Sequence, residues 1–208
     1  MKILITDDHK IVRDGLKEIL KQVPEIESIA EANDGKEALA HCHNTDFDLI
    51  LLDVSLPDMT GLEVLQSIIQ KKPEQKVLVL SMHPQEQYAL RALKLGASGY
   101  LTKSTAAEEL IAAVQKISTG GKYISSSLAE NIALHLDKDF SKPLHESLSS
   151  REFEIMIKIA AGKPLQEIGN ELYISGKTVS TYRSRILEKM GLTKNAELIQ
   201  YCIRNGLV

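Results

Sequence analysis

The sequence predicts an α/β domain built on a doubly wound parallel sheet, followed by a small all-α domain. In the first part of the chain, short apolar runs alternate with longer amphipathic ones. Two of the short runs, "LILL" and "VLVL", are apolar at every position, which is typical of strands buried on both faces. After a polar stretch, the remaining chain shows helical patterns only.

Five strands are expected, at "KILIT", "SIAEA", "DLILLD", "KVLVLS" and "SGYLT", with helical spacing between them. The polar stretch "DKDFSKPLHESLSS" contains Pro143 and clustered Ser, Asp and Lys residues, which indicates a linker. Just before it, "SSSLAENIALHL" has the spacing of a short helix. The expected parts are therefore a first domain over 1–118, a linker with a short helix over 119–147, and a helical domain over 148–208.

Composition indicates a globular protein, with 208 residues of which 43% are hydrophobic and 25% charged. The net charge of -3 hides an acidic excess in the first domain and a basic excess in the last, which suggests different partners. No apolar run approaches the ~18 residues that span a bilayer, and the first residues lack a signal-peptide pattern. Cys42 and Cys202 have no disulfide or metal spacing, so a cytoplasmic protein with no membrane partner is expected.

Carboxylates follow two of the expected strands. Asp7 and Asp8 follow the first strand, and Asp53 ends the third. Because the carboxyl ends of parallel strands meet at one edge of a sheet, these three side chains should converge near the switch in strand order. Oxygen ligands with no Cys or His among them suit Mg²⁺ better than zinc, and a bound cation would offset the repulsion between Asp7 and Asp8.

Two further strand ends bring a hydroxyl, from Ser81, and an ammonium, from Lys103, to the same edge. A carboxylate with a hydroxyl, an ammonium and a metal ion around it is typical of a phosphoryl-transfer site. We therefore expect Asp53 to attack a phosphoryl group and form an acyl phosphate. "HCH" at 41–43 is not expected to bind zinc, since positions i and i+2 of a helix do not share a face.

Residues 1–118 resemble the receiver domain of two-component response regulators. The resemblance rests on five separated elements in order, namely Asp7-Asp8, "LLDVSLPDMTG", Ser81, Tyr100 and Lys103. It implies a flavodoxin-like fold with five strands in the order 2-1-3-4-5, and phosphorylation of Asp53 by a histidine kinase. One departure is Ser104 after Lys103, where the family often has proline, so a cis bond there would cost ~3–4 kcal/mol.

The resemblance also implies roles for individual residues. Mg²⁺ would be bound by the side chains of Asp8 and Asp53, by the backbone carbonyl of Ser55, and by Asp7 through water. Ser81 and Tyr100 would form the switch, and Lys103 would contact the phosphoryl group.

The last domain contains a pattern of two helices joined by a short turn. Ile168 and Leu172 have the spacing to pack against Val179 and Ile186 across "YISGK", and Ser175 is placed to cap the second helix. This is a helix-turn-helix pattern, whose second helix would enter the major groove of double-stranded DNA. Residues 148–208 resemble a LuxR-type DNA-binding domain through "LSSRE", "AAGKPLQEIGNELYISGKTVSTY" and "ILEKMG".

The second helix carries the expected DNA-binding residues. By resemblance, Ser180, Thr181 and Ser184 would read bases, while basic side chains would contact phosphates. The full expected set is Lys177, Thr178, Ser180, Thr181, Tyr182, Arg183, Ser184, Arg185 and Lys189.

The chain is therefore identified as a response regulator of the NarL/FixJ type, in which phosphorylation favours a homodimer and controls transcription. It is expected to be a phosphoacceptor with at most slow self-dephosphorylation, not an enzyme. One alternative is an aspartate-nucleophile phosphatase, although such enzymes place a second Asp two residues after the nucleophile, where this chain has Ser55. Another is a DNA-binding protein that does not respond to phosphorylation.

Overall fold

The computed structural model describes residues 1–82, 86–104, 107–125, 129 and 143–208. The chain divides into two compact units, Met1–Lys138 and Asp139–Val208. The division falls within the linker that the sequence predicts. The helix expected at "SSSLAENIALHL" lies largely outside the described residues.

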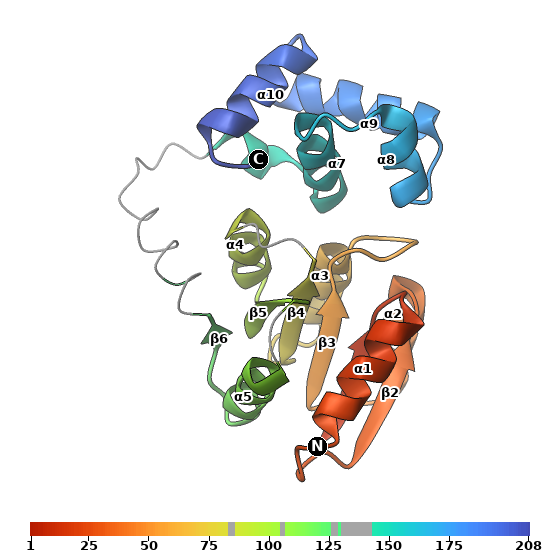
Figure 1. Ribbon diagram of the computed structural model, residues 1–208, viewed down its shortest axis with the longest axis vertical. Coiled ribbons are helices and arrows are strands. Elements are labelled where there is room, and N and C mark those ends of the chain that lie inside the picture. Colours follow the sequence, from red (N-terminus) through yellow and green to blue (C-terminus); the bar gives the residue numbers. More distant parts are fainter. Residues whose placement is uncertain (83–85, 105–106, 126–128, 130–142) are drawn as a thin grey trace. The chain divides into compact units, whose positions relative to one another are not determined.

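The first unit is a parallel sheet of six strands in the order β2-β1-β3-β4-β5-β6 (Figure 1). Its five longer strands coincide with the five expected runs: β1 (Lys2–Thr6), β2 (Ser28–Ala32), β3 (Leu49–Asp53), β4 (Val77–Ser81) and β5 (Gly99–Thr102). The sixth strand, β6 (Tyr123–Ile124), pairs with β5 and is absent from the sequence prediction. Two residues are too few for a hydrophobic period to distinguish a strand from a loop.

Helices cover both faces of this sheet. On one face, α1 (Lys10–Leu20) contacts α5 (Ala107–Ser118), and α5 packs against alternate residues of the central strands. The remaining helices contact one another in sequence order, as α2 (Gly35–Asn44), α3 (Gly61–Lys71) and α4 (Glu86–Lys94). Every residue of β3 and β4 is buried, which explains why both strands are apolar almost throughout.

The strand order reverses beside β1, which lies between β2 and β3. Connections leave β1 and β3 in opposite directions, and this opens a crevice at the carboxyl ends of these strands. The loops at this edge are the turn after β1 and the loop after β3. The loop after β3 ends at Thr60, which caps α3 in a reciprocal pair of hydrogen bonds with Glu63.

The second unit is a bundle of short helices, whose core includes Phe153, Ile168, Val179 and Leu198. Its helices are α7 (Ser150–Ala160), α8 (Leu165–Glu171), α9 (Gly176–Lys189) and α10 (Asn195–Arg204), after a single 3-10 turn, η1 (Leu144–Ser147).

The turn η1 is joined to α10 by a contact of 2.8 Å between His145 Nδ1 and the Tyr201 hydroxyl. The folded unit therefore begins upstream of the expected boundary at residue 148. Within the described part of the chain, no helix has both the length and the apolar character needed to cross a membrane.

Candidate functional site

Three charged side chains meet at the carboxyl ends of β1, β3 and β5. Lys103 Nζ lies 2.6 Å from Asp7 Oδ2 and 2.7 Å from Asp53 Oδ2. The exposed fractions of the three side chains are only 7%, 1% and 3%, respectively. The structure thus brings together the carboxylates and the lysine that the strand ends predicted, with the ammonium between the two carboxylates. The Lys103–Ser104 peptide is trans, as is every peptide bond between described residues.

Burial dominates the electrostatics of this cluster. It raises the pKa of Asp53 to about 6, with Lys103 opposing this shift and the charge of Asp7 adding to it. A hydrogen bond from the backbone N–H of Ser55 to the Asp53 carboxylate also opposes the shift. For Lys103, burial alone would lower the pKa, but pairing with Asp53 and Asp7 outweighs burial and raises it. Lys103 is therefore charged, and Asp53 is mostly ionised, at neutral pH.

The turn after β1 places an imidazole beside these carboxylates. His9 Nδ1 lies 2.6 Å from Asp8 Oδ1, and the His9 backbone N–H donates to Asp7 Oδ1 over 2.9 Å. The expectation of a cluster without histidine is wrong here, because His9 is the N-cap residue of α1 and the turn into the helix brings its ring over Asp8. The only sequence signal was its position directly after the Asp pair.

Two carboxylate oxygens in this cluster are suited to a hard cation. Asp7 Oδ2 and Asp8 Oδ1 are buried but accept no hydrogen bond of normal geometry from a described residue. The Lys103 ammonium lies 2.6 Å from the first of these atoms, and His9 Nδ1 lies 2.6 Å from the second. One ligand atom each from Asp7, Asp8 and His9 lie within 4.8 Å of one another. Two adjacent carboxylates with buried oxygens fit Mg²⁺, which prefers oxygen ligands.

The loop after β3 is held close to the phosphoacceptor candidate. A Cβ atom added at Gly61 would lie 1.9 Å from the backbone oxygen of Asp53, so only glycine fits at the start of α3. Ser55, an exposed residue of this loop, pairs with Thr60 in an isolated antiparallel bridge. Asp58 accepts hydrogen bonds from the N–H groups of Gly35 and Lys36, which ties the loop to the first turn of α2. These contacts therefore hold the loop close to the end of the strand that carries Asp53.

Ser81 and Tyr100, the expected switch residues, lie on neighbouring strands at the same edge of the sheet. Ser81 ends β4 and Tyr100 lies within β5, and their exposed fractions are 1% and 3%. Burial raises the pKa of Tyr100 to about 12, and a hydrogen bond between its hydroxyl and Ser81 opposes this shift. The two residues are thus already coupled to each other beside Asp53.

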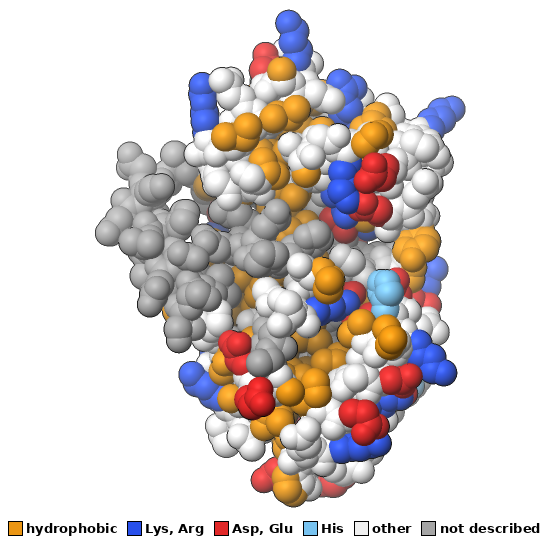
Figure 2. All heavy atoms as spheres, viewed as in Figure 1, with side chains coloured by type: hydrophobic (Ala, Val, Ile, Leu, Met, Phe, Trp, Pro, Cys, Tyr) orange, Lys and Arg blue, Asp and Glu red, His pale blue; other side chains and the backbone are white. Residues whose placement is uncertain are grey.

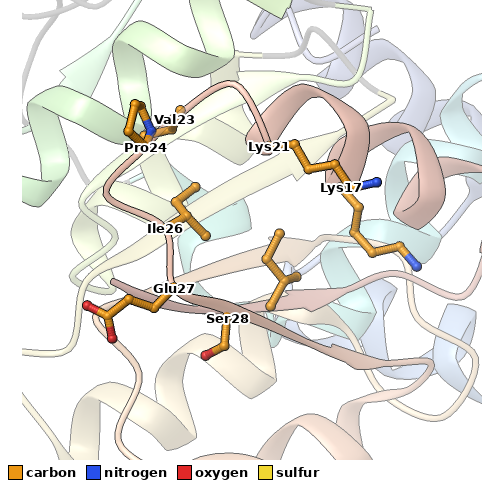
Figure 3. Close-up of a pocket in the computed structure, with 8 residues that line it drawn as sticks. Lys17, Lys21, Val23, Pro24, Ile26, Glu27 and Ser28 are labelled. Atoms are coloured by element: carbon orange, nitrogen blue, oxygen red, sulfur yellow. The ribbon is translucent and has the colours of Figure 1, made fainter.

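A shallow pocket of about 420 Å³ lies at the opposite edge of the sheet (Figure 3). It is formed by the end of α1, the following loop and the start of β2, and it is lined by Lys17, Lys21, Val23, Pro24, Ile26, Glu27, Ser28 and Ile29. The Lys17 ammonium contacts Asp14 and Glu31. In α2, Cys42 is buried and His41 packs edge-on against Phe47. Neither region adds groups to the acidic cluster.

Helix α9 presents a polar face above a buried apolar one. Val179, Ile186 and Leu187 are buried, while Tyr182 is half-buried. The exposed residues of the expected DNA-binding set are Lys177, Thr178, Thr181, Ser184, Arg185 and Lys189. Lys and Arg side chains project from the surface of this unit in Figure 2.

Two of the expected phosphate-binding side chains have partners within the domain. Arg183 Nε donates to Asn195 Oδ1 at 2.5 Å, and Lys189 Nζ lies 2.7 Å from Glu152 Oε2. Lys177 and Arg185 make no ion pair with a described residue, so they are the better candidates for phosphate contacts. Sequence spacing did not reveal this difference, since both partners lie outside α9.

Hydroxyl groups on α9 also have internal partners. Thr181 Oγ1 donates to the Lys177 carbonyl and Ser184 Oγ to the Ser180 carbonyl, both at 3.2 Å. A hydroxyl whose proton is donated to the helix offers only its lone pairs to an outside ligand. The exposed face of α9 thus combines acceptor oxygens with Lys177 and Arg185, which make no ion pair with a described residue.

Comparison with known proteins covers the whole chain. Residues 3–115 match the model of the response regulator receiver domain, and residues 146–202 match that of the bacterial regulatory proteins of the luxR family. Response regulator UvrY of Escherichia coli K12 is 33% identical over 208 residues, which cover 100% of this chain and 95% of UvrY. Transcriptional regulatory protein DegU of Brevibacillus brevis is 36% identical over 225 residues, covering 100% of this chain and 95% of DegU.

A solved structure of the RcsB response regulator from Salmonella typhimurium is 25% identical, with a TM-score of 0.62 and coverage of 97% of each chain. The two family models, the relatives matched over the whole chain and the solved structure all indicate the same two-domain organisation. The chain belongs to the NarL/FixJ family of response regulators, DNA-binding transcription regulators in which a receiver domain precedes a LuxR-type helix-turn-helix domain.

Proposed function

We propose that a sensor histidine kinase phosphorylates this response regulator at Asp53, and that the phosphorylated form binds double-stranded DNA as a homodimer. The observation that carries this proposal is the buried contact of Lys103 Nζ with both Asp53 and Asp7, at 2.7 and 2.6 Å. A lysine held between two buried carboxylates is arranged to receive a dianionic group. The proposed partners, a histidine kinase and double-stranded DNA, fit a cytoplasmic location, as do the two free cysteines.

The residues at the site divide the work of phosphoryl transfer. The Asp53 carboxylate attacks the phosphorus of a phosphohistidine, the P–N bond breaks, and its electron pair returns to the imidazole. Lys103 neutralises a phosphoryl oxygen during transfer. Asp8, Asp53 and the Ser55 carbonyl would hold Mg²⁺, with Asp7 acting through water. The ion supplies further charge neutralisation at the phosphoryl oxygens.

The phosphoryl group then changes the partner of Ser81. In this structure, the Ser81 hydroxyl is hydrogen-bonded to Tyr100. Phosphorylation of Asp53 would add negative charge and three acceptor oxygens beside this hydroxyl. Ser81 turns to donate to the phosphoryl group, and Tyr100 loses its partner and repacks. This change favours the dimer. The protein acts as a phosphoacceptor with at most slow self-dephosphorylation, not as an enzyme.

Labelling with acetyl phosphate tests the phosphoacceptor. In the presence of Mg²⁺, the wild-type chain should gain one acid-labile phosphoryl group, detected by intact-protein mass spectrometry. Asp53→Asn should abolish this gain. Glu74→Gln is the control, because Glu74 is an exposed carboxylate just before the start of β4, away from the carboxyl ends of the strands, and should leave labelling unchanged. Full labelling of Asp53→Asn would contradict the assignment.

A second measurement tests whether phosphorylation matters for DNA. Acetyl phosphate should strengthen DNA binding by the wild-type chain and leave binding by Asp53→Asn unchanged. Equal binding by the wild-type chain with and without the phosphodonor would favour regulation independent of phosphorylation.

A further inference from the structure

We propose that Arg13 is a positioning residue of the acidic site, and that its guanidinium, anchored by Glu31, holds the Asp7–Asp8 turn in the conformation that binds Mg²⁺. This role rests on the proposed function, because it concerns the same metal site. Arg13 lies in the first half of α1, and its side chain is only 13% exposed.

The backbone of Asp7 is held on both sides of the residue. Its N–H donates to the Ala32 carbonyl of β2 over 3.1 Å. Its carbonyl accepts from Arg13 Nη1 over 2.6 Å. The peptide that joins Asp7 to Asp8 therefore cannot rotate without breaking the Arg13 contact. That peptide sets the direction of the Asp8 side chain, so Arg13 acts on the metal ligand through the backbone.

Glu31 holds the guanidinium in place. Arg13 Nε donates to Glu31 Oε2 at 2.9 Å, while Lys17 Nζ lies 2.6 Å from Glu31 Oε1. The bonds from Lys17 and Arg13 lower the pKa of Glu31, so its carboxylate stays ionised and both contacts persist at neutral pH. A guanidinium offers several donors in a rigid plane, so one side chain reaches both Glu31 and the Asp7 carbonyl.

Comparing Arg13 with Lys17 distinguishes this positioning role from a general contribution to the stability of the fold. Both Arg13 and Lys17 join α1 to Glu31 of β2, but only Arg13 also contacts Asp7. If Arg13 serves only to attach the helix to the sheet, removing either side chain should have the same effect. Residues that orient metal ligands typically change metal affinity by about 10–100-fold when they are removed.

The test is a titration of the full chain with MgCl₂, followed by the backbone amide NMR signals around Asp8. Arg13→Ala should raise the Mg²⁺ dissociation constant at least about tenfold, while Lys17→Ala should change it less than about twofold. Thermal unfolding of both variants shows that the comparison is between folded proteins. Arg13→Lys keeps the charge and the folded state but cannot reach both partners, so it should also bind Mg²⁺ more weakly than Lys17→Ala does.

The outcomes distinguish two failures. Equal Mg²⁺ affinity in Arg13→Lys, Lys17→Ala and wild type would overturn the positioning role and leave the proposed function intact. A wild-type chain that does not bind Mg²⁺ would overturn the metal site of the proposed function, and the role of Arg13 with it.

Discussion

At the scale of single residues, Asp53 shows how two opposing effects set one ionisation. Burial alone would favour the neutral acid, which is a poor nucleophile, and Lys103 restores the charged form. The same lysine also lies 2.6 Å from Asp7, so one ammonium pairs with both buried carboxylates. A pKa of about 6 leaves most of the Asp53 side chains charged at neutral pH.

Glu152 provides a pH-dependent test at this scale. Its buried carboxylate accepts hydrogen bonds from the Ser149 N–H at 2.8 Å and from Lys189 Nζ at 2.7 Å. Burial alone would raise the pKa of Glu152, but these bonds lower it overall. A carboxyl whose folded pKa lies below its unfolded pKa stabilises the fold above the unfolded pKa. This stabilisation is lost as pH falls through the folded value.

The helical domain should therefore lose stability below about pH 4.5. Glu152→Gln should remove roughly 1 kcal/mol at pH 7, a modest value because Lys189 is 45% exposed and water screens the pair. The variant should lose less on acidification than wild type does. Urea unfolding at pH 7 and pH 4, followed by NMR signals of this domain, measures both effects. Glu167→Gln is the control, since its pair with Lys163 is long and exposed.

At the scale of elements, two glycines of the receiver domain should respond oppositely to alanine. A Cβ at Gly61 would collide with the Asp53 backbone oxygen, whereas a Cβ at Gly15, within α1, would meet no atom within 4 Å. Gly61→Ala should destabilise the receiver by about 1–3 kcal/mol or more and slow phosphorylation, because α3 must move away from Asp53. Gly15→Ala should stabilise it by about 0.5–1 kcal/mol. Urea unfolding of each variant, with labelling by acetyl phosphate, checks both expectations.

Substitutions in α9 should distinguish side chains that contact DNA phosphates from side chains that contact bases. Arg185→Ala should weaken binding to specific and random DNA alike, and it should lower the slope of log affinity against log salt by about 0.9, because one phosphate contact is lost. Arg204→Ala removes the same charge from α10 and should leave the slope closer to the wild-type value. Arg183→Ala is a poorer test, since it also breaks the bond to Asn195 that joins α9 to α10.

Thr181→Ala should change the DNA sequence preference, with little change in the slope of log affinity against log salt. Thr181 donates its proton to the Lys177 carbonyl, so it offers an acceptor to amino groups on the bases, such as N6 of adenine or N4 of cytosine. Selection from random DNA by wild type and by the variant would show the difference at one base pair. An unchanged preference would exclude a base contact by Thr181.

At the scale of the whole molecule, DNA affinity should depend on pairing two chains. Only Lys177 and Arg185 were identified as candidates for phosphate contacts, since neither makes an ion pair with a described residue. The hydroxyls of α9 are also less selective readers of bases than a bidentate arginine, so one helical domain should bind weakly. Phosphorylated protein should bind two half-sites about 10 bp apart at least about tenfold more tightly than one half-site. Inserting half a helical turn should remove the gain. Electrophoretic mobility assays on selected operators test this, and tight phosphate-independent binding to a single half-site would contradict it.

Local patterns along the chain predicted the five longer strands, the family and the position of the acidic cluster. Residues such as those of "LILLD" reveal a buried strand through local pattern, and parallel strands bring their ends to one edge whatever the loops do. That is why Asp7, Asp53 and Lys103 could be placed together before their distances were known.

Contacts between distant segments establish which side chains support that cluster and which basic side chains are available to DNA. Arg13 and Glu31 are 18 residues apart, and Lys189 and Glu152 are 37 apart, so no local period relates them. The position of the His9 ring over Asp8 depends on the turn that precedes α1. Strand β6 is a strand because it pairs with β5. Such contacts depend on how distant segments pack, and a pattern along the chain carries information only about the face on which each residue lies.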